Sequence, residues 1–318
     1  MQALVFDGSF RLVRDRPEPR PAAGEVLLRV RLAGICATDL EIARGYLSFR
    51  GVPGHEFVGA VVDGPPALRG RRVVAEINCV CGSCDMCSRG LASHCRRRTV
   101  VGIAGRDGAF AECLAVPAAN CHVLPDELTD EQAVLVEPLA AAFQVLRQVP
   151  IDKRSRVTVL GSGRLGLLVA QVLARTRCTL VVVGRNPRTL ELLDRRSIRT
   201  RHVSELGSAR DQDVVVECTG SPDGLGMALR LARPRGTIVM KTTCAAPLSL
   251  DLAPLVVDEI TLLGSRCGPF SDAISALARG EIDVSPFLTD IRPLSAGVEA
   301  MQAAASPDVL KILLRPGT

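Results

Sequence analysis

The chain is poor in aromatic residues and in lysine. Its 318 residues include no tryptophan and one tyrosine, and its only lysines are Lys153, Lys241 and Lys311. The formal net charge of +5 therefore comes almost wholly from arginine. A nucleic-acid surface combines clustered bases with interleaved aromatic side chains. The arginines here are scattered apart from the run Arg96-Arg97-Arg98, so we expect no nucleic-acid partner.

Long apolar runs and export signals are also missing. No apolar run reaches the roughly 18–20 residues that cross a membrane, and residues 1–20 show no charged start followed by an apolar stretch. We therefore expect a cytoplasmic protein without a membrane partner. The length is sufficient for two domains. In a chain of this size without an export signal, the twelve cysteines indicate metal ligation and buried thiols in preference to disulfides.

Four of these cysteines are closely spaced. Cys81, Cys84, Cys87 and Cys95 follow the pattern C-x2-C-x2-C-x7-C within one short stretch. Four thiolates so close in sequence can converge on one tetrahedral zinc ion. A full set of protein ligands makes a closed, structural site.

The pattern of apolar residues divides the chain into two parts. Short β-branched runs at 4–8, 25–35, 57–64 and 71–77 predict a small barrel-like domain. A capping box at 129–132 predicts a helix, which Pro138 interrupts before a second helical stretch from Ala140. Beyond Arg156, strand-like runs at 157–160, 179–183, 213–218, 236–240 and 259–264 alternate with helical segments. This alternation predicts a doubly wound parallel sheet, and the tail from about Ala276 returns to short mixed elements.

A glycine-rich turn opens the second part. Gly161-Ser162-Gly163-Arg164-Leu165-Gly166 places G-x-G-x-x-G after a strand and at the start of a helix. The first glycine permits the tight turn, the second lets a pyrophosphate approach the backbone, and the third allows close helix–strand packing. The helix N-terminus then faces the phosphates. We expect this loop to bind a nicotinamide dinucleotide.

The end of the next strand indicates which dinucleotide binds. NAD enzymes usually carry Asp or Glu there, to accept from the ribose 2′-hydroxyl. This chain has Gly184 and Arg185 instead, with Arg188 as a second basic candidate. Gly184 would leave room for a 2′-phosphate and Arg185 would supply a fork of donors to it. NADP(H) is therefore predicted over NAD(H).

Taken together, the cysteine cluster and the glycine-rich loop resemble the zinc-dependent medium-chain alcohol and polyol dehydrogenases, in the sorbitol and threonine dehydrogenase-like branch. Three further segments carry the resemblance: residues 34–39 (GICATD), 54–56 (GHE) and 137–139 (EPL). The resemblance implies a second, catalytic zinc held by Cys36, His55 and a carboxylate, with one position open for substrate. Either Glu56 or Glu137 can be that carboxylate, and both are kept.

Further roles follow from the same resemblance. Asp39 would accept from the other ring nitrogen of His55, and Thr38 would contact the substrate hydroxyl. Many family members carry histidine at the position of Glu41, so the outer proton relay stays unassigned. Arg266 lies in the segment that approaches the nicotinamide in family members.

The implied protein is a two-zinc oxidoreductase that transfers a hydride between NADP(H) and a small alcohol or its carbonyl form. Its GroES-like catalytic domain would comprise residues 1–143 and 276–318, with a zinc lobe at about 79–97, and its Rossmann domain residues 144–275. A homodimer or homotetramer is expected, as in the family. The alternatives are an NAD-dependent polyol or threonine-type dehydrogenase, and an NADP-binding regulatory or redox-sensing protein without turnover.

Overall fold

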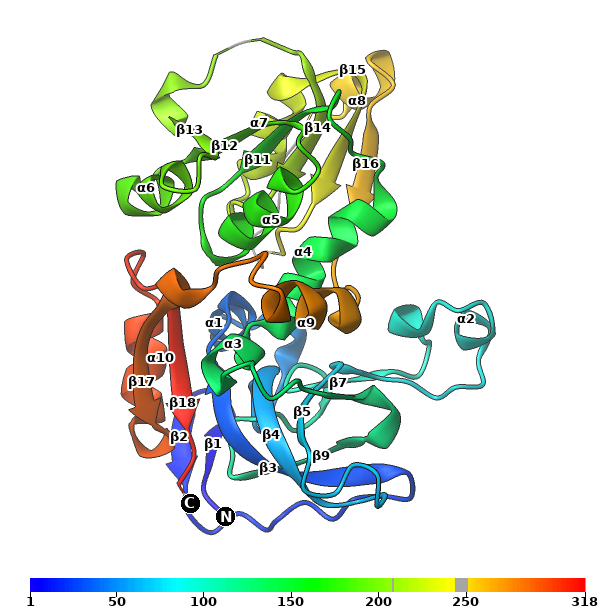
Figure 1. Cartoon of the computed structure of the whole chain (residues 1–318), viewed down its shortest axis with the longest axis vertical. Coiled ribbons are helices and arrows are strands. Elements are labelled where there is room, and N and C mark those ends of the chain that lie inside the picture. Colours follow the sequence, from blue (N-terminus) through cyan, green and yellow to red (C-terminus); the bar gives the residue numbers. More distant parts are fainter. Residues whose placement is uncertain (208, 244–250, 318) are drawn as a thin grey trace. The chain divides into compact units, whose positions relative to one another are not determined.

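The structure is a computed structural model that describes residues 1–207, 209–243 and 251–317. It contains two compact units, which we call the β unit (residues 1–137 and 270–318) and the parallel-sheet unit (residues 138–269). Both chain termini belong to the β unit (Figure 1). In the described residues, no helix combines the length and apolar character needed to cross a membrane.

The β unit is built on a mainly antiparallel sheet with the strand order β10-β5-β4-β3-β18-β17, and β9 also pairs with β3. The strands of this unit are β1 (Ala3–Phe6), β2 (Phe10–Val13), β3 (Glu25–Gly34), β4 (Glu56–Asp63), β5 (Arg72–Ala75), β6 (Asn78–Cys79), β7 (Thr99–Val101), β8 (Gly105–Arg106), β9 (Cys113–Pro117), β10 (Cys121–Val123), β17 (Leu288–Pro293) and β18 (Lys311–Arg315). Its helices are α1 (Ala37–Ala43), α2 (Asp85–Ser88), α3 (Asp130–Val134), α9 (Phe270–Ala278) and α10 (Gly297–Ala304).

The C-terminal tail is part of this sheet. β18 runs antiparallel to β3, with Leu313 opposite Gly34 and Leu314 opposite Ala33. Its side chains from Lys311 to Leu314 are buried. The tail thus belongs to the same compact unit as the N-terminal strands.

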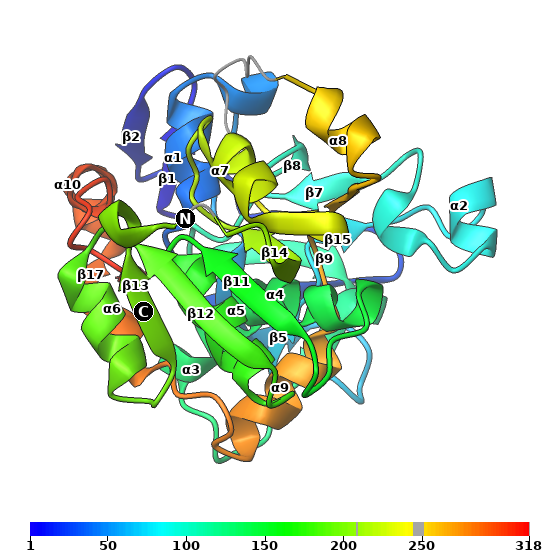
Figure 2. The same ribbon diagram turned by 90° about the horizontal axis from the view of Figure 1, so that it is seen from above.

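The parallel-sheet unit has the strand order β13-β12-β11-β14-β15-β16, with all neighbours parallel. Its elements are β11 (Arg156–Leu160), β12 (Thr179–Gly184), β13 (Arg199–His202), β14 (Gln212–Glu217), β15 (Ala232–Met240), β16 (Thr261–Gly264), α5 (Arg164–Ala174), α6 (Pro187–Asp194), α7 (Gly224–Leu231) and α8 (Ala253–Val257). Figure 2 shows strands β13, β12, β11 and β14 side by side. This is the predicted doubly wound fold, and the order reverses between β11 and β14, where such sheets bind ligands at the carboxyl ends of their strands.

Two details differ from the sequence-based prediction. The unit boundaries fall six residues earlier than predicted, at 137/138 in place of 143/144 and at 269/270 in place of 275/276. They lie at the starts of α4 (Val136–Gln148) and α9, whose apolar sequences carry no break in composition. The helix break also comes earlier, because α3 ends with its C-cap at Leu135. Pro138 does not interrupt a helix but lies in the first turn of α4, where its missing N–H needs no partner.

Candidate active site

Three strands of the β unit bring the predicted catalytic-zinc residues together at one place. β3 ends and β4 begins side by side, with Gly34 opposite Glu56, so Cys36 and His55 lie just beyond two neighbouring strand ends. Cys36 is the N-cap residue of α1, the helix that follows β3. β18 lies on the other side of β3 and starts at Lys311. Residues 36, 55 and 311 are thus neighbours because of strand pairing.

Cys36, His55 and Glu56 form a group suited to a metal ion. One donor atom from each lies within 4.8 Å of the others. A tetrahedral zinc with bonds of about 2.0–2.3 Å separates its donor atoms by roughly 3.3–3.8 Å, so small side-chain rotations would close the group. In the described part of the chain, Glu56 Oε1 is buried without a hydrogen-bond partner. The residues present therefore fit a zinc ion in both donor chemistry and unmet bonding capacity.

Asp39 lies behind His55 and orders the loop. Its Oδ1 is 3.5 Å from His55 Nδ1, which leaves Nε2 as the nitrogen available to a metal. Its Oδ2 accepts a hydrogen bond of 2.8 Å from the Cys36 backbone N–H. Burial disfavours the charged imidazole, but the Asp39 carboxylate and the Cys36 sulfur outweigh it and raise the pKa of His55 well above its usual value. The surroundings of His55 thus favour positive charge.

Glu56 has a partner that the sequence analysis did not identify. Its Oε2 accepts from Lys311 Nζ at 2.5 Å, and the same ammonium donates to the Ile35 carbonyl at 3.1 Å. Glu56 is 0% exposed and Lys311 is 2% exposed. The ion pair thus occupies the Oε2 atom of Glu56. The Oε1 atom stays available to a metal ion. A lysine inside an apolar strand of an arginine-rich chain was the signal available in the sequence.

The other predicted residues occupy less central positions. Thr38 lies in the first turn of α1, with its Oγ1 3.9 Å from Cys36 Sγ. Glu137 lies in the first turn of α4, and the group of donor atoms defined above does not include it. Glu41 of α1 forms an ion pair of 2.6 Å with Arg44, the C-cap residue of that helix. The geometry therefore brings Glu56, in preference to Glu137, into the group with Cys36 and His55.

The predicted structural-zinc cysteines also converge. Cys84 Sγ lies 3.6 Å from that of Cys87 and 3.8 Å from that of Cys95, and the Cys95 and Cys81 sulfurs are 3.5 Å apart. Zinc–sulfur bonds of 2.3 Å in a tetrahedron place the sulfurs about 3.8 Å from one another, so the residues fit the ion. The backbone N–H of Ser83 is the largest of several influences that lower the pKa of Cys81 to about 5. Figure 1 shows that this lobe, with α2, extends away from the sheet of the β unit.

The glycine-rich loop adopts the geometry that its motif predicts. Gly161 has a φ of +103°, and a Cβ on Gly166 would lie 1.9 Å from the Gly161 carbonyl oxygen. A Cβ on Gly163 would meet nothing within 4 Å, so the backbone there is open to a ligand. Arg164 and Leu165 begin α5, whose N-cap is Gly163. The loop can therefore receive a pyrophosphate at the helix N-terminus.

The end of β12 presents two free arginines. Arg185 and Arg188 are exposed, and neither guanidinium has a hydrogen bond or ion pair with any described residue. The surroundings of Gly184 contradict our prediction that this glycine leaves room for a phosphate. A Cβ there would lie 2.1 Å from Ser162 Oγ, so the space beside Gly184 is already filled. Arg266 follows β16 and is exposed, and its carbonyl accepts from the buried Lys241 Nζ at 3.2 Å.

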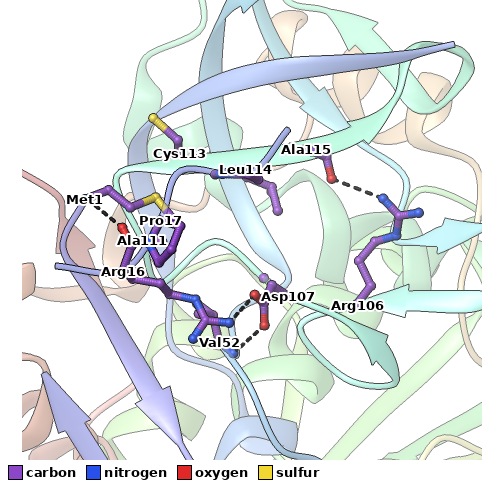
Figure 3. Close-up of a pocket in the computed structure, with 12 residues that line it drawn as sticks. Met1, Arg16, Pro17, Val52, Arg106, Asp107, Ala111, Cys113, Leu114 and Ala115 are labelled. Atoms are coloured by element: carbon purple, nitrogen blue, oxygen red, sulfur yellow. Dashed lines mark hydrogen bonds and ion pairs between the residues drawn. The ribbon is translucent and has the colours of Figure 1, made fainter. Parts of the chain in front are cut away.

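A separate hollow of about 460 Å³ lies in the β unit (Figure 3). Its charged groups are bonded within its wall. Asp107 accepts from the Val52 backbone at 2.8 Å and from Arg16 at 2.5 Å, and the Met1 ammonium donates to the Arg16 carbonyl at 2.8 Å. Arg106 donates to the Ala115 carbonyl at 3.3 Å and to Glu25. The hollow shares no lining residue with the Cys36 group, and we assign no ligand to it.

Known proteins resemble the whole chain. Residues 22–126 match the alcohol dehydrogenase GroES-like domain, and residues 165–280 match the zinc-binding dehydrogenase domain. A 2-dehydro-3-deoxy-L-galactonate 5-dehydrogenase from Pseudoalteromonas atlantica is 31% identical over 86% of this chain and 86% of its own.

Two solved structures share the fold at 26% identity, each over 99% of both chains. One is the alcohol dehydrogenase rspB from Escherichia coli CFT073 in complex with NADH, with a TM-score of 0.90. The other is a zinc-binding dehydrogenase from Sinorhizobium meliloti 1021 bound to NADP, with a TM-score of 0.87.

Proposed function

Since the chain belongs to the zinc-dependent medium-chain alcohol and polyol dehydrogenase family, and is an enzyme of that class, we propose that it transfers a hydride between NADP(H) and a small alcohol or polyol or the matching carbonyl compound. The observation that supports this most is the buried Cys36–His55–Glu56 group with its unmet bonding capacity. A regulatory protein without turnover would have no need of such a group.

In the proposed mechanism Cys36, His55 and a glutamate would hold the catalytic zinc. When bound, this ion polarises a carbonyl group and lowers the pKa of an alcohol as a Lewis acid. Asp39 fixes the orientation of the His55 ring. Through its hydrogen bond with the Cys36 backbone N–H, it also fixes the position of the Cys36 sulfur. Thr38 would hydrogen-bond the substrate hydroxyl, because its own Oγ1 lies 3.9 Å from the sulfur of Cys36, one of the proposed zinc ligands.

A substrate panel tests the proposed function directly. Purified enzyme would be incubated with simple alcohols, polyols, sugar acids and amino alcohols, and with the matching carbonyls, while the NADPH absorbance band is followed. NADH would be run in parallel. Turnover of at least one alcohol or carbonyl supports the proposal, and a metal-loaded enzyme that binds NADPH but turns over none of them would leave the regulatory alternative.

Cofactor choice is the finer part of the proposal. The guanidinium groups of Arg185 and Arg188 have no hydrogen bond or ion pair in the described chain, and the strand end carries no acidic residue that would repel a 2′-phosphate. The S. meliloti relative holds NADP, which favours the same choice. The E. coli relative holds NADH, which keeps an NAD-dependent enzyme as the second candidate.

Replacing Arg185 with alanine is expected to raise the dissociation constant of NADPH about tenfold to a hundredfold. A charge-assisted arginine–phosphate bond contributes roughly 1.5–3 kcal/mol, and NADH does not form it. Fluorescence titration at one fixed salt concentration measures both cofactors. Arg195→Ala is the matched control, because that exposed arginine, the C-cap residue of α6, pairs with Glu191. An unmodified enzyme that binds NADH as tightly as NADPH would show that Arg185 does not select the cofactor.

We also propose two zinc ions per chain, one in each cysteine-containing group. Cys84→Ser should remove one zinc and lower the free energy of unfolding together, because a structural zinc contributes directly to folding. Elemental analysis and thermal unfolding measure the two quantities. Retention of two zinc ions by this variant would place the second ion elsewhere.

A homodimer or homotetramer is proposed for the assembly. β16 lies at an edge of its sheet, and the nearby Val256 and Val257 are 78% and 79% exposed, with Leu262 on the strand itself 43% exposed. A second copy paired along this edge would cover these side chains and the free strand edge. Sedimentation velocity should show a species of at least twice the 33.8 kDa chain mass; a monomer at micromolar concentration would contradict the proposal.

A further inference from the structure

A buried hydrogen-bond chain joins the glycine-rich loop to the first turn of α6. Ser162 Oγ lies 2.7 Å from Thr189 Oγ1, and the two residues are 5% and 3% exposed. Thr189 Oγ1 donates to the Asn186 carbonyl at 2.9 Å. Because the single hydroxyl proton of Thr189 is used in that bond, Ser162 must be the donor to Thr189. We call this Ser162–Thr189–Asn186 chain the loop–helix brace.

Gly184 makes the brace possible. A Cβ at this position would lie 2.1 Å from Ser162 Oγ, 2.6 Å from Ser162 Cβ and 2.9 Å from Leu190 Cδ2. Those distances are far below ordinary van der Waals contact, so any larger residue would push the serine away from α6. The absence of a side chain at Gly184 therefore allows Ser162 to approach Thr189. It does not create space for a ligand.

The two ends of the brace adjoin different anion-binding groups. Ser162 lies between Gly161 and Gly163, in the loop whose backbone would bind a pyrophosphate at the N-terminus of α5. Thr189 directly follows Arg188, and Asn186 directly follows Arg185. The brace thus sets the distance between the pyrophosphate loop and the two arginines proposed to bind a 2′-phosphate.

We propose that Ser162 and Thr189 are specificity-determining residues that position these two phosphate sites for NADP(H). The proposal rests on the function proposed above. NADP(H) engages both sites at once, whereas NAD(H) engages the pyrophosphate loop alone. A change in the spacing therefore weakens the cofactor that must span it, and has a smaller effect on the other.

The test compares Ser162→Ala, Thr189→Val and the double variant, with NADPH and NADH dissociation constants measured by fluorescence titration. The quantity of interest is the ratio of the NADH to the NADPH dissociation constant. We expect each single variant to lower this ratio about three- to tenfold, the range for loss of one neutral hydrogen bond. The double variant should lower it no further, because both singles break the same bond.

Two controls separate positioning from general destabilisation. Thr189→Ser keeps the hydroxyl and should keep the ratio. Thr158→Val removes a different buried hydroxyl, on strand β11 of the same unit, whose Oγ1 donates to Gln212 Oε1 at 2.9 Å, and it should leave the ratio unchanged.

The outcomes distinguish this proposal from the cofactor assignment. An unmodified enzyme that prefers NADH contradicts the cofactor assignment alone, because the change in the ratio on mutation still tests the brace. Equal weakening of both cofactors, or no weakening of either, would overturn the specificity role of Ser162 and Thr189.

Discussion

Cys36→Ala is expected to lower kcat/KM by more than two orders of magnitude while the fold remains. Loss of a residue that merely supports a metal ligand costs about 10- to 100-fold, and Cys36 is a member of the donor group itself. The fold should persist because Cys36 is only partly buried and its place at the start of α1 is an N-cap, whose loss costs about 1 kcal/mol. Asp39→Asn should lower kcat/KM less, by the roughly 10- to 100-fold expected for a residue that supports a metal ligand.

Elemental analysis and circular dichroism complete this measurement. The Cys36→Ala protein should lose the zinc of the Cys36 group, retain that of the four-cysteine lobe and keep its secondary structure. Cys178→Ala is the matched control, since that thiol belongs to neither group. A Cys36→Ala enzyme with its full zinc content and unchanged turnover would move the catalytic centre away from this group.

Local spacing explains which parts of the molecule the sequence could predict. The four-cysteine lobe and the glycine-rich loop are each contained in fewer than twenty consecutive residues, so their geometry follows from the motif alone. Cys36 and His55 required the resemblance, because only the pairing of β3 with β4 brings them together. The capping box at Thr129 was likewise local, and it is present.

The missed features depend on long-range or cooperative contacts. β13 reads Arg-Thr-Arg-His, a polar edge strand without the apolar run that marks a buried parallel strand. The role of Gly184 depends on Ser162, 22 residues earlier, and could not be seen from the strand end alone. The ion pair between Glu56 and Lys311 joins residues 255 positions apart.

The lysines of this chain show how composition could have pointed to that pair. In a chain with 39 basic residues, arginine has replaced lysine almost everywhere. Two of the three lysines that remain, Lys241 and Lys311, are buried, and each donates to several acceptors from one compact ammonium. A guanidinium is planar and larger and binds in a fixed fork, so it does not replace a point charge in a closed site. Two of the three retained lysines thus mark enclosed positions.

Lys311→Met is expected to destabilise the protein by about 3–5 kcal/mol, the cost of leaving a buried charge without its partner. Glu56 is fully buried, and Lys311 supplies the counter-charge to its Oε2. Methionine has a similar length and removes only the ammonium, so lost packing contributes little. Urea or guanidinium unfolding with a fixed zinc concentration measures the change.

A double variant tests the origin of this loss. In Lys311→Met/Glu56→Gln no buried charge remains to be neutralised, so the double variant should be more stable than Lys311→Met alone. If the two residues contributed independently, the stability losses of the two single variants would simply add. Lys153→Met is the matched control, because Lys153 is the exposed lysine of the three and its replacement should change stability by less than about 0.5 kcal/mol. If Lys311→Met were as stable as the Lys153→Met control, the buried carboxylate would have to be neutral or otherwise compensated. Glu56 would then not be held as an anion for the metal by this lysine.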